Sequence, residues 1–209
     1  MFEDRIHAGK LLAEKLVDVV NGKNSIVLAI PRGGVITGSE VSKKLNAELD
    51  IIVSKKITPP NSSEFAIGSI VHDGTTYLEP HWKIYSNNEQ IAKEIEIKTK
   101  EVQRRLLQYR SSSNYSFDAK KTVIIVDDGM ATGCTVQVIL KWLSNYNIRD
   151  IILAVPVMPA STYEIFKKLI KRVIVLELPT FFSSVSQFYD KFDQVTDEKV
   201  IQVLHDSKV

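Results

Sequence analysis

Short apolar runs alternate along this chain with longer stretches of helical spacing, and this alternation constrains the fold more than any other feature. The runs Ser25–Ile30, Thr122–Val126 and 150–157 consist almost entirely of apolar residues. Strands with no polar face are typical of a sheet buried on both sides. Strands that alternate with helices favour a parallel sheet between helical layers. The sequence therefore predicts an α/β fold with a central, mainly parallel sheet flanked by helices.

Local signals predict several further elements. The stretch "LDIIVSK", residues 49–55, has the composition of one more buried strand. Asp73 and Gly74 form a favoured two-residue turn, which predicts a hairpin around them. Ser86 and Glu89 fit a capping box at the start of a long helix. The loop Lys56–Ala66 contains two prolines and two serines, and we expect it to connect two of these elements.

Composition narrows the class of protein. The 209 residues suit a single domain over 1–209, and the 44% hydrophobic content is enough for a full core. The formal net charge of +2 gives little support to general nucleic-acid binding. The single cysteine, Cys134, forms no internal disulfide, which favours a reducing compartment. With no signal peptide at the N-terminus and no long apolar run, we expect a soluble cytoplasmic protein.

The stretch "TVIIVDDGMATGCTV", residues 122–136, holds the strongest chemical signal. A buried strand ends in the adjacent acids Asp127 and Asp128, and small residues and threonines follow at a helix start. Ligands of parallel sheets bind beyond the carboxyl ends of the strands. Carboxylates accept hydrogen bonds from vicinal hydroxyls, and amides at a helix N-terminus bind phosphate. The pattern predicts a sugar-phosphate site rather than a simple helix cap.

Other interpretations of the polar residues are weaker. The chain has neither the glycine-rich lysine motif of nucleoside-triphosphate loops nor a dinucleotide fingerprint. Cys134 at a helix start could be a nucleophile, but no histidine lies near it in the sequence. The four histidines lack the spacing of metal ligands. We therefore expect no metal bound directly by the protein.

The stretch "VIIVDDGMATGCTV" resembles the phosphoribosyl-diphosphate binding signature of type I phosphoribosyltransferases. The stretch "LAIPRGGV" is similar to the pyrophosphate loop of that family, and "VSKKITPPNSSEFAIGSI" is similar to its second strand and mobile catalytic loop. Both chain ends, "FEDRIHAGKLLAEKL" and "FFSSVSQFYDKFDQVTDEKV", resemble a subgroup of stand-alone bacterial members whose substrate is poorly defined. The resemblance covers almost the whole chain.

This resemblance implies a set of roles. Asp127 and Asp128 would hold the ribose hydroxyls. The 5′-phosphate would lie on the loop formed by Ala131, Thr132, Gly133, Cys134 and Thr135. The pyrophosphate would contact Arg32, Gly33, Gly34, Lys55 and Lys56, and an unusual peptide bond often occurs in that loop. Magnesium would be held mainly by substrate oxygens and water.

The implied reaction also needs a lid and an acceptor site. Breaking the C1–O bond leaves an oxocarbenium-like ribose, so the site must stabilise pyrophosphate and exclude water. Lys56–Ala66 is the candidate lid, in which Lys56 and Glu64 are the candidate catalytic residues beside the two aspartates. Ala131 replaces an aspartate found in 6-oxopurine enzymes, which argues against that mechanism of purine binding.

A small hood, built from the N-terminal segment and residues about 178–209, would select the acceptor. Phe188 or Tyr189 could stack on a planar base there, although hydrophobic closure over the core is an equal alternative. The implied reaction transfers a 5-phosphoribosyl group to a nucleobase-like nitrogen in nucleotide salvage, by a homodimer. The alternative is a regulator of the same fold that senses phosphoribosyl diphosphate or nucleotides and binds nucleic acid. A diphosphate-forming kinase would need a longer, duplicated chain.

Overall fold

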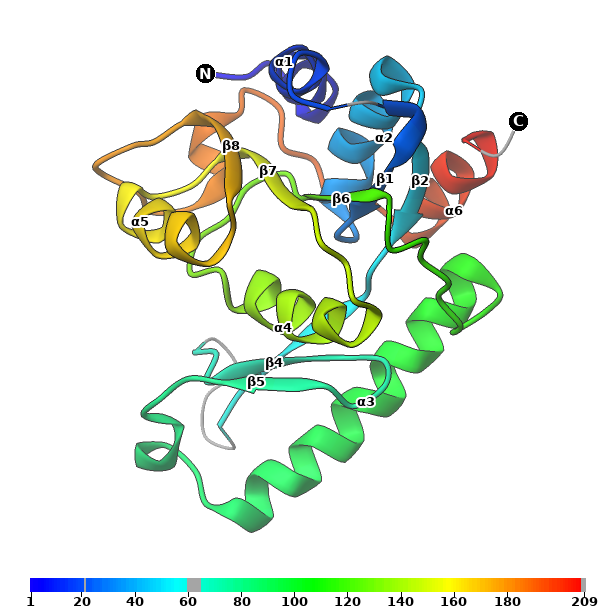
Figure 1. Ribbon diagram of the computed structural model, residues 1–209. Coiled ribbons are helices and arrows are strands. Elements are labelled where there is room, and N and C mark those ends of the chain that lie inside the picture. The colour runs from blue at the N-terminus through cyan, green and yellow to red at the C-terminus, as the bar shows by residue number, and fades with distance from the viewer. Residues whose placement is uncertain (21, 60–64, 208–209) are drawn as a thin grey trace. The chain divides into compact units, whose positions relative to one another are not determined.

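The computed structural model describes residues 1–20, 22–59 and 65–207 (Figure 1). These residues form two compact units. The first comprises 1–51, 117–132 and 148–209, and the second comprises 52–116 and 133–147. In the described ranges, no helix is both long enough and apolar enough to cross a lipid bilayer.

The first unit is built on a five-stranded parallel sheet with the strand order β2-β1-β6-β7-β8. In this order the strands are Glu48–Ile51, Ser25–Ala29, Thr122–Val126, Ile151–Val157 and Arg172–Glu177. β1, β6 and β7 are buried along almost their whole length, whereas the edge strand β8 is half-buried. The predicted parallel α/β fold is confirmed.

Four α-helices accompany this sheet: α1 (Arg5–Val17), α2 (Gly33–Leu45), α5 (Ala160–Leu169) and α6 (Asp197–Asp206). α1 begins at Asp4, whose carboxylate accepts the His7 N–H at 2.8 Å and so satisfies a helix-end donor. α1 packs against α2, and α2 packs against β1 and α6. The 3₁₀ turns η1 (Gly22–Asn24) and η4 (Val185–Phe188) complete the first unit.

The second unit contains an antiparallel sheet with the order β3-β4-β5, formed by Ser54–Ile57, Gly68–Val71 and Thr76–Leu78. The predicted hairpin is confirmed, and Gly74 at its turn has a φ of 86°. The long α3 (Asn88–Arg110) packs against β3 and β4, and α4 (Cys134–Leu143) packs against all three strands. Two 3₁₀ turns, η2 (Trp82–Ile84) and η3 (Ser144–Tyr146), also lie in this unit.

Two local predictions were wrong. The run 49–55 is not one strand, because β2 ends at Ile51 in the parallel sheet and β3 begins at Ser54 in the antiparallel sheet. The capping box of α3 lies one residue later than predicted. Asn87 accepts the Gln90 N–H at 2.9 Å, and the Gln90 side chain accepts the Asn87 N–H at 3.1 Å. Asparagine caps helices as well as serine does, so the two overlapping patterns compete.

Candidate functional site

The two adjacent acids lie at the carboxyl edge of the parallel sheet, against the start of α2. β1 and β6 end level with each other, since Ala29 pairs with Val126 and the Ile30 N–H donates to the Val126 carbonyl. The acids after β6 and the glycines after β1 therefore lie together. A Cβ atom on Gly33 would lie 1.8 Å from Asp128 Oδ2, and a Cβ on Gly34 would lie 2.8 Å from the Asp127 Cα. A side chain at Gly33 would force the Asp128 carboxylate to move, and one at Gly34 would meet the Asp127 backbone.

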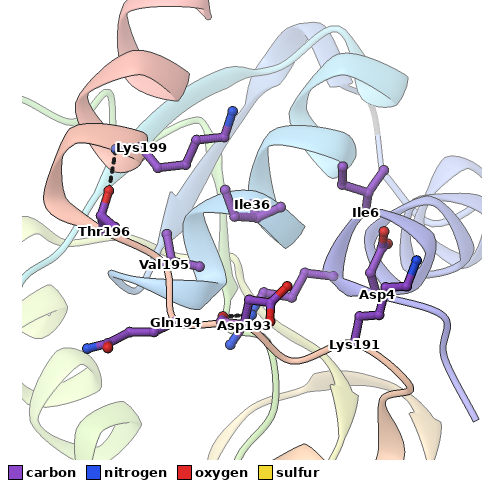
Figure 2. A pocket seen from close by; sticks show the side chains of 10 residues that line it. Asp4, Ile6, Ile36, Lys191, Asp193, Gln194, Val195, Thr196 and Lys199 are labelled. Atoms are coloured by element: carbon purple, nitrogen blue, oxygen red, sulfur yellow. Dashed lines mark hydrogen bonds between the residues drawn. The ribbon is translucent and has the colours of Figure 1, made fainter.

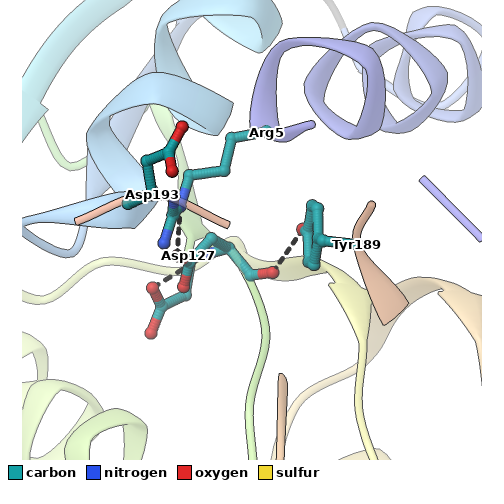
Figure 3. Close-up of polar contacts among 5 residues, drawn as sticks. Arg5, Asp127, Tyr189 and Asp193 are labelled. Carbon is teal, nitrogen blue, oxygen red and sulfur yellow. Dashed lines mark hydrogen bonds and ion pairs between the residues drawn. The ribbon is translucent and has the colours of Figure 1, made fainter. Parts of the chain in front are cut away.

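Asp128 forms an ion pair with Arg5, which reaches it from the first turn of α1 (Figure 3). Arg5 Nε donates to Asp128 Oδ2 at 2.6 Å, and the two side chains are only 11% and 15% exposed. Arg5 Nη1 also donates to the Asp193 carbonyl at 2.7 Å, and the guanidinium lies 3.7 Å from the centre of the Phe192 ring. Arg5 thus links the acid pair to the C-terminal segment.

Asp127 has the more strongly perturbed carboxyl group of the pair. Its Oδ1 accepts the backbone N–H of Asp128 at 2.8 Å. Burial raises the pKa of Asp127 well above its ordinary value, and the adjacent Asp128 carboxylate raises this pKa further. The Asp128 backbone N–H and the Arg5 charge oppose the rise. A carboxyl group with a raised pKa at the end of a buried strand is a candidate for function.

Tyr189 supports the same acids from the C-terminal segment. Its hydroxyl donates to the Asp128 carbonyl at 2.6 Å (Figure 3). Its ring is 6% exposed and packs 5.2 Å from the Phe2 ring and 5.0 Å from the Phe192 ring, centre to centre. Burial raises the pKa of the Tyr189 hydroxyl, so it stays a donor at neutral pH. Phe188 is half-buried and stacks on Phe182. In this structure both predicted base-binding rings contact aromatic neighbours.

The predicted pyrophosphate loop adjoins the N-terminus of α2. The Pro31–Arg32 peptide bond is cis, and Arg32 is the N-cap residue of α2 without a side-chain cap hydrogen bond. The Arg32 guanidinium lies 3.6 Å from the Asp197 carboxylate at the start of α6. The first turn of α2 lies against the acids at Gly33 and Gly34, and its helix dipole adds partial positive charge there.

In the predicted phosphate loop, Ala131 and Thr132 belong to the first unit, and residues 133–135 belong to the second. The Ala131 carbonyl accepts the Thr162 hydroxyl at 2.7 Å, and Thr132 is exposed. Gly133 has a φ of 80° and precedes α4 without a side-chain cap, so the first amides of α4 are not capped by that residue. Cys134 is buried and its thiol donates to Glu79 at 2.9 Å, while Thr135 is half-buried.

The two predicted lysines lie in the second unit. Lys55 forms an ion pair with Glu101 of α3, and it lowers the pKa of that carboxyl group. Lys56 follows it in β3 with an exposed side chain. Residues 60–64 of the predicted lid, which include Glu64, lie outside the described residues.

A cavity of about 420 Å³ adjoins Arg5 within the first unit (Figure 2). Its wall is formed by residues 4–6 at the start of α1, Ile36 of α2, Lys191, residues 193–196, and Lys199 of α6. Apolar and charged side chains are mixed in this wall. The cavity and the acid pair therefore share one side chain, Arg5.

No cluster of three or more potential ligands among His, Cys, Asp and Glu occurs in the part of the chain that the structure describes. The acid pair supplies two carboxyl groups, and one of them is already paired with Arg5. This donor set could supplement the coordination of a metal ion held by a substrate, but it is not a complete metal centre.

Sequence reasoning missed two residues of this arrangement, Arg5 in its contact with Asp128 and the hydroxyl of Tyr189. Arg5 is separated from Asp128 by 123 residues, and Tyr189 by 61. No local periodicity links residues so far apart. The stretch "FEDRIHAGKLLAEKL" contains Arg5, but its resemblance to a family subgroup assigned no role to that residue.

Comparison with known proteins places these features in a family context. The sequence profile of the "Phosphoribosyl transferase domain" family matches residues 3–193. Two Mycobacterium tuberculosis proteins, named "Putative phosphoribosyl transferase MT0597" and "Putative phosphoribosyl transferase Rv0571c", are each 34% identical over 206 residues. The match covers 98% of this chain and 46% of each relative. The chain thus spans about half the length of these curated relatives.

Solved structures resemble the chain as well. The crystal structure of TT1426 from Thermus thermophilus is 33% identical, covers 98% of both chains and has a TM-score of 0.82. The AQ2163 protein from Aquifex aeolicus is 14% identical, with a TM-score of 0.51 over 82% of this chain and 72% of that one. The second likeness concerns the fold alone.

Proposed function

The chain belongs to the phosphoribosyl transferase family, and from this premise we propose that it transfers a 5-phosphoribosyl group from phosphoribosyl diphosphate to a nucleobase-like nitrogen. Pyrophosphate is the leaving group. The observation that carries the proposal is the position of Asp127 and Asp128 against Gly33 and Gly34 at the carboxyl edge of the sheet. Two acids that accept hydrogen bonds and a glycine turn at a helix start match a ribose diol beside a diphosphate.

The acids serve the ribose end of the substrate in this proposal. Each carboxyl group accepts a hydrogen bond from one of the vicinal hydroxyls, which fixes the sugar relative to the sheet. The same negative charges lie near the ribose ring as it becomes oxocarbenium-like, and they stabilise that charge. The phosphate binds at the loop Ala131–Thr135, which leads into the N-terminus of α4, where backbone amides favour anions.

The leaving group needs positive charge. The first turn of α2 lies beside the acids at Gly33 and Gly34, and its amides suit the departing pyrophosphate. We assign the Arg32 side chain to the same anion, which requires it to leave Asp197. We assign Lys55 and Lys56 to the same task, which requires Lys55 to exchange Glu101 for the substrate. Magnesium, when bound, would supply positive charge to the diphosphate oxygens. Asp127 and Asp128 would be the residues that assist in holding it.

The proposal extends to the rest of the chain. Residues 1–209 act as one transferase domain, and the hood comprises the N-terminal segment and residues about 178–209. The parallel bridge between Phe2 and Tyr189 supports a joint role for these two segments. Within the hood, Phe188 and Tyr189 stay the proposed base-binding rings. We further propose a magnesium-dependent homodimer that acts in nucleotide salvage.

Calorimetry tests the proposal directly. Phosphoribosyl diphosphate is titrated with magnesium into the wild-type protein, first alone and then with nucleobases and nucleoside monophosphates. The matched variants are Asp127→Asn/Asp128→Asn and a control, Asp18→Asn/Asp206→Asn, which removes two exposed carboxylates of the same unit.

We expect tight binding by the wild type and the control, competition by one monophosphate, and a loss of at least tenfold in the site variant, since hydrogen bonds to charged groups are strong. Unchanged binding by the folded site variant would contradict the role of the acids. A wild type that binds neither the diphosphate nor any monophosphate would overturn the proposed reaction and favour a regulator.

A further inference from the structure

Protein donors already occupy one oxygen on each carboxyl group of the acid pair. Arg5 Nε donates to Oδ2 of Asp128 at 2.6 Å, and the Asp128 backbone N–H donates to Oδ1 of Asp127 at 2.8 Å. No described residue donates an N–H to the second oxygen of either group within hydrogen-bonding distance. Burial raises the pKa of Asp127, and the two carboxyl groups also lie close enough to share a proton, which raises this pKa further. When both groups are charged, each has one oxygen left to accept a hydrogen bond from a ligand.

Two free oxygens match the two hydroxyl donors of a vicinal diol. If Arg5 were absent, Asp128 would have both oxygens open and its side chain could rotate. Each hydroxyl could then donate to any of several carboxylate oxygens. The loss of one hydroxyl would leave the other well bound. With Arg5 present, a missing hydroxyl leaves one carboxylate oxygen without a donor, which is costly in a largely buried site.

Arg5 is itself held rigidly. Its guanidinium lies on the Phe192 ring at 3.7 Å, and Nη1 is fixed by the Asp193 carbonyl at 2.7 Å. A Cβ on Gly33 would lie 2.7 Å from Arg5 Nε, so the start of α2 limits movement on that side. The planar fork of arginine makes both hydrogen bonds at once, which the point charge of lysine does not reproduce.

We propose that Arg5 is a positioning residue that leaves one acceptor oxygen on each acid and so selects ribose over 2-deoxyribose. This inference rests on the proposed function, because it assigns the acids to the sugar hydroxyls. It goes beyond that function by naming a specificity determinant outside the phosphoribosyl motif. Burial and the adjacent Asp128 carboxylate raise the pKa of Asp127, whereas the Arg5 charge lowers it and so favours the charged form that accepts hydrogen bonds.

The test compares two ligands that differ by one hydroxyl, ribose 5-phosphate and 2-deoxyribose 5-phosphate. Their dissociation constants are measured by calorimetry for the wild type, Arg5→Gln and Arg5→Lys. The matched control is Arg172→Gln. Arg172 also pairs with a carboxylate, Asp150, and donates to a backbone carbonyl, that of Val19, but at the edge strand β8. Circular dichroism checks that each variant is folded.

The wild type and Arg172→Gln are expected to prefer ribose 5-phosphate by about tenfold or more, the effect of one hydrogen bond to a charged group. Arg5→Gln is expected to reduce this preference to about threefold or less, mainly through weaker ribose binding, and Arg5→Lys to fall between. A merely structural role would weaken both sugars equally and leave their ratio unchanged, which would overturn the proposal.

The outcomes also separate this proposal from the proposed function. A wild type that selects ribose, with an unchanged ratio in Arg5→Gln, refutes the role of Arg5 alone. A wild type that binds the two sugar phosphates equally refutes the one-oxygen arrangement. A wild type that binds neither sugar phosphate nor phosphoribosyl diphosphate refutes both the inference and the proposed reaction.

Discussion

Gly33 offers a sharp test of how closely the acid pair is built against α2. A Cβ atom at this position would lie 1.8 Å from Asp128 Oδ2, whereas ordinary van der Waals contact begins at 3.4 Å. In Gly33→Ala the carboxylate oxygen must therefore move by about 1.6 Å if α2 keeps its place. If the oxygen moves away from Arg5, the Arg5–Asp128 hydrogen bond, now 2.6 Å, would exceed 3.5 Å and break.

The magnitude follows from the burial of this pair. Both side chains are at least 85% buried, so solvent screens their interaction only weakly. Loss of a hydrogen bond between charged groups costs about 1.5–3 kcal/mol. We expect Gly33→Ala to lower the free energy of unfolding by about this amount and to weaken binding of ribose 5-phosphate about tenfold or more.

Urea denaturation and calorimetry measure the two effects. The double variant Gly33→Ala/Arg5→Gln shows whether the clash acts through the ion pair, because its combined effect should then be clearly less than additive. Wild-type stability together with wild-type ribose binding in Gly33→Ala would refute the close approach of α2 and the acids. Additive losses in the double variant would show that the glycine acts by another route.

Two further predictions concern stability. The pKa of Asp127 is raised in the folded protein above its ordinary value of 3.8, so the stability linked to its proton is present at low pH and is lost as the pH rises from about 3.8 through the raised pKa. Asp127→Asn should therefore match the wild type near the low end of that window and be more stable at pH 7, by about 1.4 kcal/mol for each unit of elevation. Urea denaturation at several pH values checks this, and a gain that does not grow with pH would contradict it. Phe166 is fully buried on α5, so Phe166→Ala should lower the free energy of unfolding by about 3–5 kcal/mol. The 90% exposed Phe181 is its control, and Phe181→Ala should unfold like the wild type; similar losses in both variants would show that burial is not the cause.

The sequence alone was enough to predict the parallel sheet and the place of the acid pair within it. Uninterrupted apolar strands report burial on both faces, and burial on both faces in turn requires flanking helices. Asp127 and Asp128 follow β6 directly, so the end of that strand fixes their position at the carboxyl edge. Such inferences succeed because each depends on residues adjacent in the chain.

Local sequence patterns gave wrong predictions where two different structures were compatible with the same residues. The run 49–55 is apolar through Val53 apart from Asp50, and nothing in it marks where the chain leaves one sheet for another. An extended apolar segment suits either sheet, so hydrogen-bond partners elsewhere decide where β2 ends. The capping box of α3 similarly moved from Ser86 to Asn87, because both side chains can cap a helix.

Only the tertiary structure decided how the acids are held. Arg5 and Asp128 are 123 residues apart, and the Tyr189 hydroxyl reaches the same aspartate from the opposite end of the chain. Each contact depends on how α1 and the C-terminal segment pack, and packing leaves no periodic signal in the sequence. The motif determined which groups would face a sugar phosphate, whereas long-range packing decided which of their oxygens stay open.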